Sequence, residues 1–301
     1  MTMVFDATPL AERMLTDIAA QMKAAGLQPG LAVLQAADNA GAAAYTRRIV
    51  AMAALGGVRC VLEDVPVGAD AQAFQAQLAR LAARDDVDGV LVQFPTPRGV
   101  DRRMITDHLP PERDVDCLHP VHLGCIMAGD PVYQPCTAMA AVSVAACLAG
   151  DLRGLHCVIV GASAVVGRPL SMRLLDRGAT VSVTHLDTRD IASVCRTADV
   201  LFAAAGSANL VRRDWIRAGA VIIDIGVNRD PDTGALVGDV RLDEAVGHAR
   251  AITAVPNGVG PLTTAFLIAN TAHAACLRNG CRFTYPDIGA IHRALSGTVS
   301  L

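Results

Sequence analysis

Short apolar runs alternate with helical stretches along most of the chain, and this alternation constrains the fold more than any other feature of the sequence. Hydrophobic residues make up 52% of the 301 residues and aromatic residues only 3%, so the buried strands consist mainly of Ala, Val, Leu and Ile. The pattern predicts an α/β fold in which helices cover parallel sheets. The expected strands are 31–35, 59–62, 89–93, 157–160, 180–184, 200–204 and 221–225.

The length of the chain predicts two domains of about 150 residues each. We expect an N-terminal α/β substrate domain over residues 1–145, completed by a C-terminal helical segment at about 262–301. Residues 146–261 are expected to form a doubly wound, Rossmann-type dinucleotide-binding domain. A cleft between the two domains is expected to hold the ligands.

Charge and cysteine usage exclude several function classes. The 26 basic and 29 acidic residues give a net charge of −3, which argues against a nucleic-acid or membrane partner. The longest uncharged stretch, 251–277, contains Pro256 and Pro261 and therefore predicts strand, loop and helix, not a membrane span. Residues 1–25 lack an apolar signal core, so we expect a cytoplasmic protein. The nine cysteines form no C-x-x-C pair, which argues against a disulfide framework or a zinc knuckle.

A glycine turn marks a candidate cofactor site. The segment 158–169, VIVGASAVVGRP, predicts a strand, a turn and the start of a helix. Gly161 permits a tight turn, Gly167 permits close helix–strand packing, and the helix N-terminus offers N–H groups to a pyrophosphate. Because Ser163 stands at the second glycine of G-x-G-x-x-G, an ordinary strand–helix turn fits these residues as well.

The residues after the next strand bear on the choice of cofactor. His185 and Asp187 close this strand, where an acidic side chain would reach the ribose of a dinucleotide. The alternative is that Asp187 caps the following helix. A carboxylate here would repel a 2′-phosphate and favours NAD, whereas Arg189 is close enough to keep NADP open.

Six ordered motifs then point to one family. They are 92–95 (VQFP) with Pro97, 114–116 (DVD) with His119 and Pro120, 134–137 (QPCT), 161–169 (GASAVVGRP), 237–240 (VGDV), and 256–261 (PNGVGP) with Thr263. Over about residues 5–280 the chain resembles the bifunctional methylenetetrahydrofolate dehydrogenase/methenyltetrahydrofolate cyclohydrolases.

The resemblance implies a role for each matching residue. Tyr45 would stack on the folate ring system, Gln93 and Asp116 would line the substrate site, and these three would be the catalytic group. Asp116 would hydrogen-bond the amino-pterin edge. Further substrate contacts would come from Pro256, Gly258, Gly260, Pro261 and Thr263. Cofactor contacts would come from Gly161, Ala162, Ser163, Val166, Gly167, His185, Asp187 and Ile225. The resemblance also implies a homodimer formed through the cofactor domain.

One departure from the family concerns its catalytic lysine, which lies four residues after the tyrosine, on the same helix face. Ile49 stands at that position, and Lys23, the only lysine, lies on an earlier predicted helix. Hydrolysis of the methenyl group needs a group that carries protons. Hydride transfer needs only the alignment of the methylene carbon with the nicotinamide and the exclusion of water. We therefore expect NAD(P)-dependent oxidation of 5,10-methylenetetrahydrofolate to 5,10-methenyltetrahydrofolate, with cyclohydrolase activity weak or lost. NAD is slightly favoured, with tetrahydrofolate as the carrier of the substrate.

Other departures keep alternatives open. Ala42, Cys117 and Ala138 replace a serine, a glycine and a proline of the family around the same pocket. They fit a dehydrogenase-like paralogue that acts on another one-carbon adduct or imine, or a non-catalytic folate- or nucleotide-binding paralogue. Asp116-x-x-His119-x-x-His122 has a spacing compatible with metal ligands, but we expect no metal. Cys117 and Cys136 could be nucleophiles paired with His119. Packing is the favoured role for Cys136, whereas the role of Cys117 stays open because the family has glycine at this position.

Overall fold

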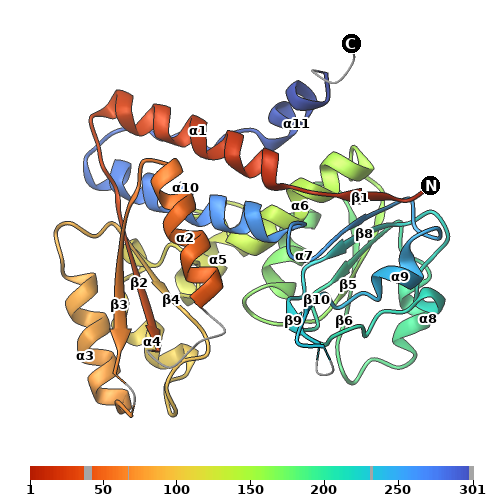
Figure 1. Ribbon diagram of the computed structural model, residues 1–301, viewed down its shortest axis with the longest axis horizontal. Coiled ribbons are helices and arrows are strands. Elements are labelled where there is room, and N and C mark those ends of the chain that lie inside the picture. Colours follow the sequence, from red (N-terminus) through yellow and green to blue (C-terminus); the bar gives the residue numbers. More distant parts are fainter. Residues whose placement is uncertain (37–42, 67, 231–232, 298–301) are drawn as a thin grey trace. The chain divides into compact units, whose positions relative to one another are not determined.

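The computed structural model describes residues 1–36, 43–66, 68–230 and 233–297 (Figure 1). The chain forms two compact units. The three-stranded unit comprises Glu12–Gln134 and Thr264–Asp287. The six-stranded unit comprises Met1–Ala11, Pro135–Thr263 and the C-terminal segment from Ile288.

The three-stranded unit contains a parallel sheet with the strand order β3-β2-β4. The strands are β2 (Gly30–Ala36), β3 (Arg59–Val65) and β4 (Gly89–Val92). The helices are α2 (Ala43–Leu55), α3 (Ala71–Ala82), α4 (Arg102–His108), η1 (Pro111–Arg113) and α5 (Pro120–Ala128), with most of α1 (Thr8–Ala25) and α10 (Gly260–Arg278). Alternate residues of β2 are buried on opposite faces of the sheet, and Phe74, Leu78 and Leu81 of α3 pack on one of these faces.

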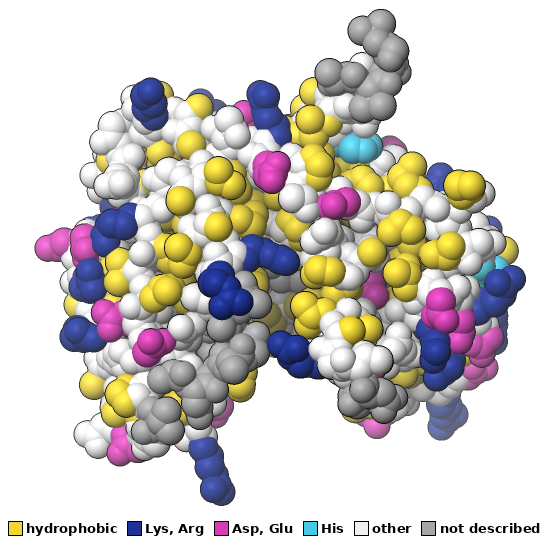
Figure 2. Space-filling model, in the orientation of Figure 1, with side chains coloured by type: hydrophobic (Ala, Val, Ile, Leu, Met, Phe, Trp, Pro, Cys, Tyr) yellow, Lys and Arg dark blue, Asp and Glu magenta, His cyan; other side chains and the backbone are white. Residues whose placement is uncertain are grey.

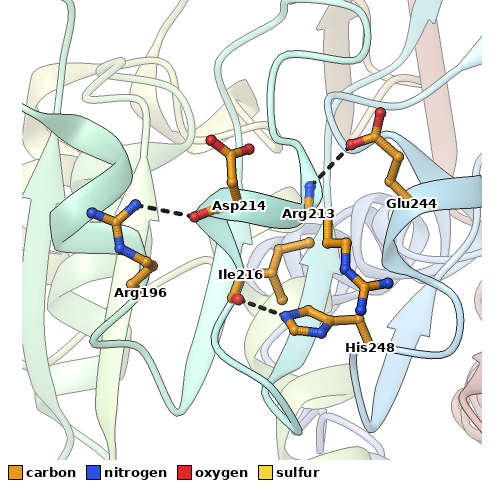
Figure 3. A pocket seen from close by; sticks show the side chains of 6 residues that line it. All are labelled: Arg196, Arg213, Asp214, Ile216, Glu244 and His248. Atoms are coloured by element: carbon orange, nitrogen blue, oxygen red, sulfur yellow. Dashed lines mark hydrogen bonds between the residues drawn. The ribbon is translucent and has the colours of Figure 1, made fainter.

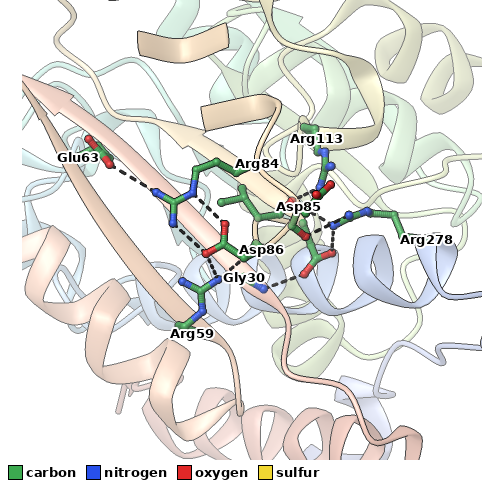
Figure 4. Close-up of polar contacts among 10 residues, drawn as sticks. Gly30, Arg59, Glu63, Arg84, Asp85, Asp86, Arg113 and Arg278 are labelled. Carbon is green, nitrogen blue, oxygen red and sulfur yellow. Dashed lines mark hydrogen bonds and ion pairs between the residues drawn. The ribbon is translucent and has the colours of Figure 1, made fainter. Parts of the chain in front are cut away.

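The amino ends of these strands are joined by ion pairs (Figure 4). Asp88, just before β4, accepts hydrogen bonds from the backbone N–H of Gly30 at 2.8 Å and from the Arg278 guanidinium at 2.6 Å. Arg59, at the start of β3, pairs with Asp86 at 2.9 Å. No Cβ fits at Gly30, because it would lie 2.0 Å from the Asp86 carbonyl oxygen. The amino end is therefore packed and charge-paired.

The six-stranded unit contains a parallel sheet with the order β1-β11-β8-β7-β5-β6 and a two-stranded antiparallel pair. The sheet strands are β1 (Met3–Phe5), β5 (His156–Val160), β6 (Thr180–Thr184), β7 (Val200–Ala203), β8 (Val221–Asp224) and β11 (Ala251–Thr253). The antiparallel pair is β9 (Asn228–Arg229) and β10 (Leu236–Val237). The helices are α6 (Cys136–Ala149), α7 (Gly167–Leu175), α8 (Ile191–Cys195), η2 (Arg213–Trp215), α9 (Leu242–Ala245) and α11 (Ile288–Gly297).

All seven strands expected from the sequence are present within a few residues of their expected bounds. The boundaries of the units differ from the expected domain boundaries. The central segment of the six-stranded unit begins at Pro135 because α6 packs on α7 and β8. The unit also includes the final helix α11, which packs on α6. The edge strand β1 also joins this unit by pairing with β11. Residues Arg213–Trp215 form only the short 3-10 turn η2, and Trp215 packs against the core of the sheet.

In the described part of the chain, every helix is too short or too polar to cross a membrane. Basic and acidic side chains are interspersed over the face shown in Figure 2. The mixture agrees with the near balance of charges in the sequence.

Candidate functional site

Three polar side chains lie at the carboxyl end of the three-stranded sheet. Gln35 and Asp64 are register partners near the ends of β2 and β3, and Gln35 Nε2 donates to Asp64 Oδ1 at 2.9 Å. Gln93 follows β4, and its backbone N–H donates to the Leu34 carbonyl oxygen at 2.9 Å. The carboxyl ends of parallel strands are where α/β proteins bind ligands. The sheet therefore holds Gln93 at a position suited to a binding site.

Helix α2 places Thr46 against this group. The Thr46 Oγ1 atom lies 2.6 Å from Gln35 Oε1 and 3.0 Å from Gln93 Oε1. Thr46 and Gln93 are 4% and 6% exposed. The Nε2 atom of Gln93 is buried and finds no hydrogen-bond partner among the described residues. The network thus ends on a polar atom that the described part of the chain leaves unpaired.

The side chain of Ile49 is fully buried on α2. It follows Tyr45 by four residues and Thr46 by three, so all three lie on one side of the helix. Tyr45 is half-buried, whereas Arg47 is exposed and Arg48 half-buried. The residue at the expected lysine position is therefore an apolar core residue that cannot carry a proton.

The Asp114–Cys117 turn brings a second predicted substrate residue into the three-stranded unit. Asp116 is half-buried, and Asp114 is fully buried and accepts a hydrogen bond from the His119 backbone N–H at 2.6 Å. Burial raises the pKa of Asp114. Cys117 has φ +59°, a left-handed conformation that favours glycine. The backbone thus explains why glycine suits this position.

Cys117, His119 and His122 make contacts that bear on the alternative roles considered for them. Burial raises the pKa of Cys117 well above its usual value, so the thiol stays protonated and is a poor nucleophile. His119 caps α5 by accepting from the Val121 N–H, and the His122 ring bonds the Pro111 carbonyl oxygen at 2.8 Å. In residues 1–36, 43–66, 68–230 and 233–297, no group of three His, Cys, Asp or Glu side chains is arranged to hold a metal.

The glycine turn lies at the carboxyl end of β5, in the six-stranded unit. A Cβ on Gly161, which has φ +119°, would lie 2.1 Å from the Ala204 carbonyl oxygen. A Cβ on Gly167 would lie 2.0 Å from the Gly161 carbonyl oxygen. Ser163 Oγ accepts from the Val166 N–H at 3.1 Å, which leaves the hydroxyl proton available to an anion. Ala162 and Val166 are half-buried beside this turn.

The residues after β6 are strongly exposed. The side chains of His185 and Asp187 are 56% and 95% exposed, with His185 Nδ1 and Asp187 Oδ2 3.6 Å apart. Asp190, not Asp187, caps α8, because its carboxylate accepts from the Ser193 N–H. The helix-capping alternative for Asp187 is therefore wrong. Ile225 follows β8 and donates its N–H to the Ala203 carbonyl oxygen at 2.8 Å.

Two buried carboxyl groups fix the loops at this end of the six-stranded sheet. Asp239 is fully buried and accepts from the N–H groups of Ala205, Gly206 and Ser207 at 2.6–3.0 Å. Asp224 accepts from the backbone N–H of Asp239 at 3.0 Å. Desolvation raises the pKa of Asp224 to about 7. The sequence shows the motif around Asp239 but does not reveal that its carboxylate holds this loop.

The segment after β11 leads into α10. Pro256 is exposed, whereas Gly258 is buried, and a Cβ there would lie 2.6 Å from Thr253 Cβ. Gly260 and Pro261 begin the helix, where proline is favoured because its missing N–H needs no partner. Thr263, half-buried in the first turn, bonds the carbonyl oxygen of Val259 through its backbone N–H at 3.0 Å.

A hollow of about 510 Å³ in the six-stranded unit is lined by residues of η2 and α9 and by Arg196, Ile216 and His248 (Figure 3). Arg196 donates to the Asp214 carbonyl oxygen, and the backbone N–H of Arg213 donates to Glu244. His248 bonds the Ile216 carbonyl oxygen. None of the site residues expected from the sequence lines this hollow.

Two parts of the sequence match the two domains of one known enzyme family. Residues 5–116 match the tetrahydrofolate dehydrogenase/cyclohydrolase catalytic domain, and residues 135–279 match the NAD(P)-binding domain of the same enzymes. The chain belongs to this family. Bifunctional protein FolD 1 of Rhizorhabdus wittichii is 39% identical over 287 residues, which cover 93% of this chain and 97% of that protein. Both the predicted resemblance and the two-domain α/β fold are thereby confirmed.

Solved structures of the tetrahydrofolate dehydrogenase/cyclohydrolase family agree. The bifunctional enzyme FolD from Campylobacter jejuni is 32% identical with a TM-score of 0.85, covering 92% of this chain and 100% of that one. FolD from Trypanosoma brucei, solved with NADP cofactor and an inhibitor, is 31% identical with a TM-score of 0.86, covering 92% and 98%. The chain is therefore a member of an oxidoreductase family of folate one-carbon metabolism with an NAD(P)-binding domain.

Sequence reasoning missed three polar residues at the candidate substrate site of this family member: Gln35, Asp64 and Thr46. Gln35 and Asp64 stand near the ends of strands, and Thr46 directly follows Tyr45. Polar residues near the carboxyl ends of parallel strands are a signal that could have found the first two. The pairing of Thr46 with Gln93 depends on how α2 packs against the sheet, which the sequence does not state.

Proposed function

We propose that this protein oxidises 5,10-methylenetetrahydrofolate to 5,10-methenyltetrahydrofolate with NAD(P)+ and has little or no cyclohydrolase activity. The observation that carries the proposal is the fully buried Ile49 on the same side of α2 as Tyr45. The resemblance implies that the family's lysine would stand at this position. Isoleucine cannot shuttle the proton that water attack requires, whereas hydride transfer needs no such group.

The substrate contacts follow from the three-stranded unit. Tyr45 would stack on the folate ring system and Asp116 would accept hydrogen bonds from the amino-pterin edge. Gln93, buried and incompletely paired within the described residues, would contact the substrate near its reacting part. In the six-stranded unit, the segment of Pro256, Gly258, Gly260, Pro261 and Thr263 would lie over the substrate.

The glycine turn of the six-stranded unit fits a dinucleotide. Side chains at Gly161 and Gly167 would collide with the backbone, so the turn keeps its polar backbone groups open to a phosphate. The Ser163 hydroxyl would donate a hydrogen bond to the phosphate. The bound nicotinamide supplies the hydride acceptor.

NAD is the favoured cofactor because of Asp187. Its exposed carboxylate caps no helix and is available to the ribose hydroxyls, whereas it would repel a 2′-phosphate. Ala162 and Leu186, the other positions near the ribose, carry no positive charge. His185 and Ile225 would complete the contacts of the nucleotide. The homodimer and the cytoplasmic location expected from the sequence remain predictions.

One assay tests the activity and the cofactor together. The protein is incubated with 5,10-methylenetetrahydrofolate and either NAD+ or NADP+, and reduced nicotinamide and the methenyl product are followed separately. We expect reduction of both cofactors, with the higher kcat/KM for NAD+. The absence of enzyme-dependent reduction with either cofactor would contradict the proposal.

A second candidate, a dehydrogenase-like enzyme for another one-carbon adduct or imine, is favoured by one observation. Cys117 occupies a left-handed position next to Asp116, where glycine is the unstrained choice, so the substrate turn differs from the family pattern. Calorimetry with tetrahydrofolate separates the candidates, because a changed specificity predicts weak folate binding. A non-catalytic binding paralogue would bind folate or nucleotide without turnover.

A further inference from the structure

The hydrogen-bond chain beside Gln93 has a direction, and that direction is set at its far end. Asp64 carries a carboxylate, which accepts hydrogen bonds and does not donate them when ionised. Gln35 Nε2 donates to Asp64 Oδ1 at 2.9 Å, so the other end of the Gln35 amide, Oε1, faces Thr46. Gln35 can therefore only accept from Thr46.

Thr46 has a single hydroxyl proton. The short 2.6 Å separation from Gln35 Oε1 assigns this proton to Gln35. With Oε1 of Gln93 also facing the hydroxyl at 3.0 Å, two acceptors would compete for one proton. In the same orientation, Nε2 of Gln93 is buried without a partner among the described residues. Unpaired buried N–H groups are rare in proteins, and unsatisfied carbonyl oxygens are less so.

We propose that the Gln93 amide is turned by 180° so that Nε2 donates to Thr46 Oγ1 and Oε1 occupies the buried, unpaired position. Every hydrogen bond of the chain is then satisfied in one direction: Gln93 to Thr46, Thr46 to Gln35, and Gln35 to Asp64. Thr46 is thus a positioning residue, because its hydroxyl orients the Gln93 amide so that Oε1 is the hydrogen-bond acceptor in the site. The ligand group that it fits is an N–H or O–H donor.

The inference rests on the proposed function only where it assigns the donor to the folate substrate. An amide oxygen orients a donor but does not remove its proton, so this arrangement aligns the substrate without acid–base catalysis. Misalignment of a reacting substrate lowers its turnover more than its binding. Loss of the Thr46 hydroxyl should therefore act mainly on kcat.

The orientation is tested on the ligand-free protein by NMR. We expect nuclear Overhauser contacts from the Gln93 side-chain NH2 protons to the Thr46 side chain, and slow solvent exchange of one of these protons. In Thr46→Val that proton should exchange faster, whereas Thr46→Ser should retain the protection. If the NH2 protons show no contact with Thr46, the proposed orientation is overturned, whatever the protein catalyses.

Kinetics test the positioning role. With 5,10-methylenetetrahydrofolate, we expect Thr46→Val to lower kcat roughly tenfold while KM changes less than about threefold, and Thr46→Ser to stay within about twofold of the parent. The control is Thr106→Val, since Thr106 is similarly buried and its hydroxyl bonds its own helix at the Arg103 carbonyl oxygen.

The two tests separate the hypotheses. If the parent turns over folate and Thr46→Val matches the control, the positioning role is overturned. If the parent lacks folate turnover but the NMR contacts are present, the proposed function and the assignment of the donor to folate both fail. The proposed direction of the hydrogen bonds from Gln93 to Asp64 then still stands.

Discussion

The two ends of the three-stranded sheet both carry polar side chains, but these side chains are organised in opposite ways. At the amino end, Asp88 holds both the Gly30 N–H and the Arg278 guanidinium, and Asp86 pairs with Arg59 (Figure 4). At the carboxyl end, the polar chain stops at Gln93, whose amide keeps one unpaired buried atom within the described residues. Paired charges join strands, whereas an incompletely paired group is poised to bind a ligand.

Substitutions at the two ends should therefore have different consequences for stability and for activity. Substitutions at the amino end should destabilise the protein without changing its specificity, because no predicted site residue lies there. Substitutions at the carboxyl end should change activity at a moderate cost in stability. The contrast is tested below at both ends of the three-stranded sheet, after a first test of a buried carboxyl group in the six-stranded unit.

The largest effect is expected at the carboxyl end of the six-stranded sheet, where the buried Asp224 keeps its proton up to about pH 7 in the folded protein. An unfolded aspartate releases its proton near pH 4. Between these values the folded state binds more protons, so the free energy of unfolding falls as the pH rises and levels off above about pH 7. The contribution of this group is on the order of 4 kcal/mol.

Urea unfolding of the parent and Asp224→Asn at several pH values isolates this contribution. The variant should show a flatter pH dependence than the parent between pH 4 and 7, whatever its absolute stability. Parallel curves for the two proteins would show that Asp224 does not titrate in this range.

At the amino end of the three-stranded sheet, Asp88→Asn should lower the free energy of unfolding by about 2–3 kcal/mol. It removes the charge partner of the partly buried Arg278 guanidinium. Asp86→Asn is the matched control, since its ion pair with Arg59 is more exposed and should shift the urea midpoint much less. The KM for the folate substrate should stay unchanged in both variants; a changed KM would place this end near the substrate.

At the carboxyl end, Ile49→Lys should add cyclohydrolase activity. An amine one turn beyond Tyr45 would be desolvated, which favours its neutral, proton-accepting form. General acid–base catalysis reaches roughly 100- to 10,000-fold, and a partial gain of roughly 10- to 100-fold over the parent is expected. The substitution should destabilise the fold by about 1–3 kcal/mol.

The readout for Ile49→Lys is the decay of methenyltetrahydrofolate, with Ile49→Met as a control that keeps the volume but adds no amine. A folded lysine variant with no gain over the methionine variant would mean that more than one position blocks hydrolysis. The changed-substrate candidate would then be favoured.

The smallest effect concerns the left-handed turn at Cys117. Cys117→Gly should be more stable than Cys117→Ala by about 1 kcal/mol, because only alanine keeps the strain of φ +59°. Both variants lose the thiol, so the difference isolates the backbone. Equal urea midpoints would indicate that the turn relaxes without cost.

Features of the fold and of the site were predictable from the sequence when they depend on residues that are close together in the chain. The strands and the glycine turn were predictable because they depend on local patterns, and the contacts of Gly161 and Gly167 show the steric need directly. The assignment of the final segment to the six-stranded unit depends on contacts between α11 and α6 that are distant in the sequence. The Thr46–Gln93 pair depends on packing of the same kind.

We propose that the chain has kept oxidation and lost hydrolysis, and the fate of the methenyl product distinguishes the two activities. Purified protein is added at increasing concentration to 5,10-methenyltetrahydrofolate at neutral pH, and the absorbance of the methenyl group is followed. We expect the absorbance to decay at the rate of the enzyme-free solution at every concentration, while the same preparation reduces NAD+ with methylenetetrahydrofolate. A decay rate that rises in proportion to the protein would contradict it.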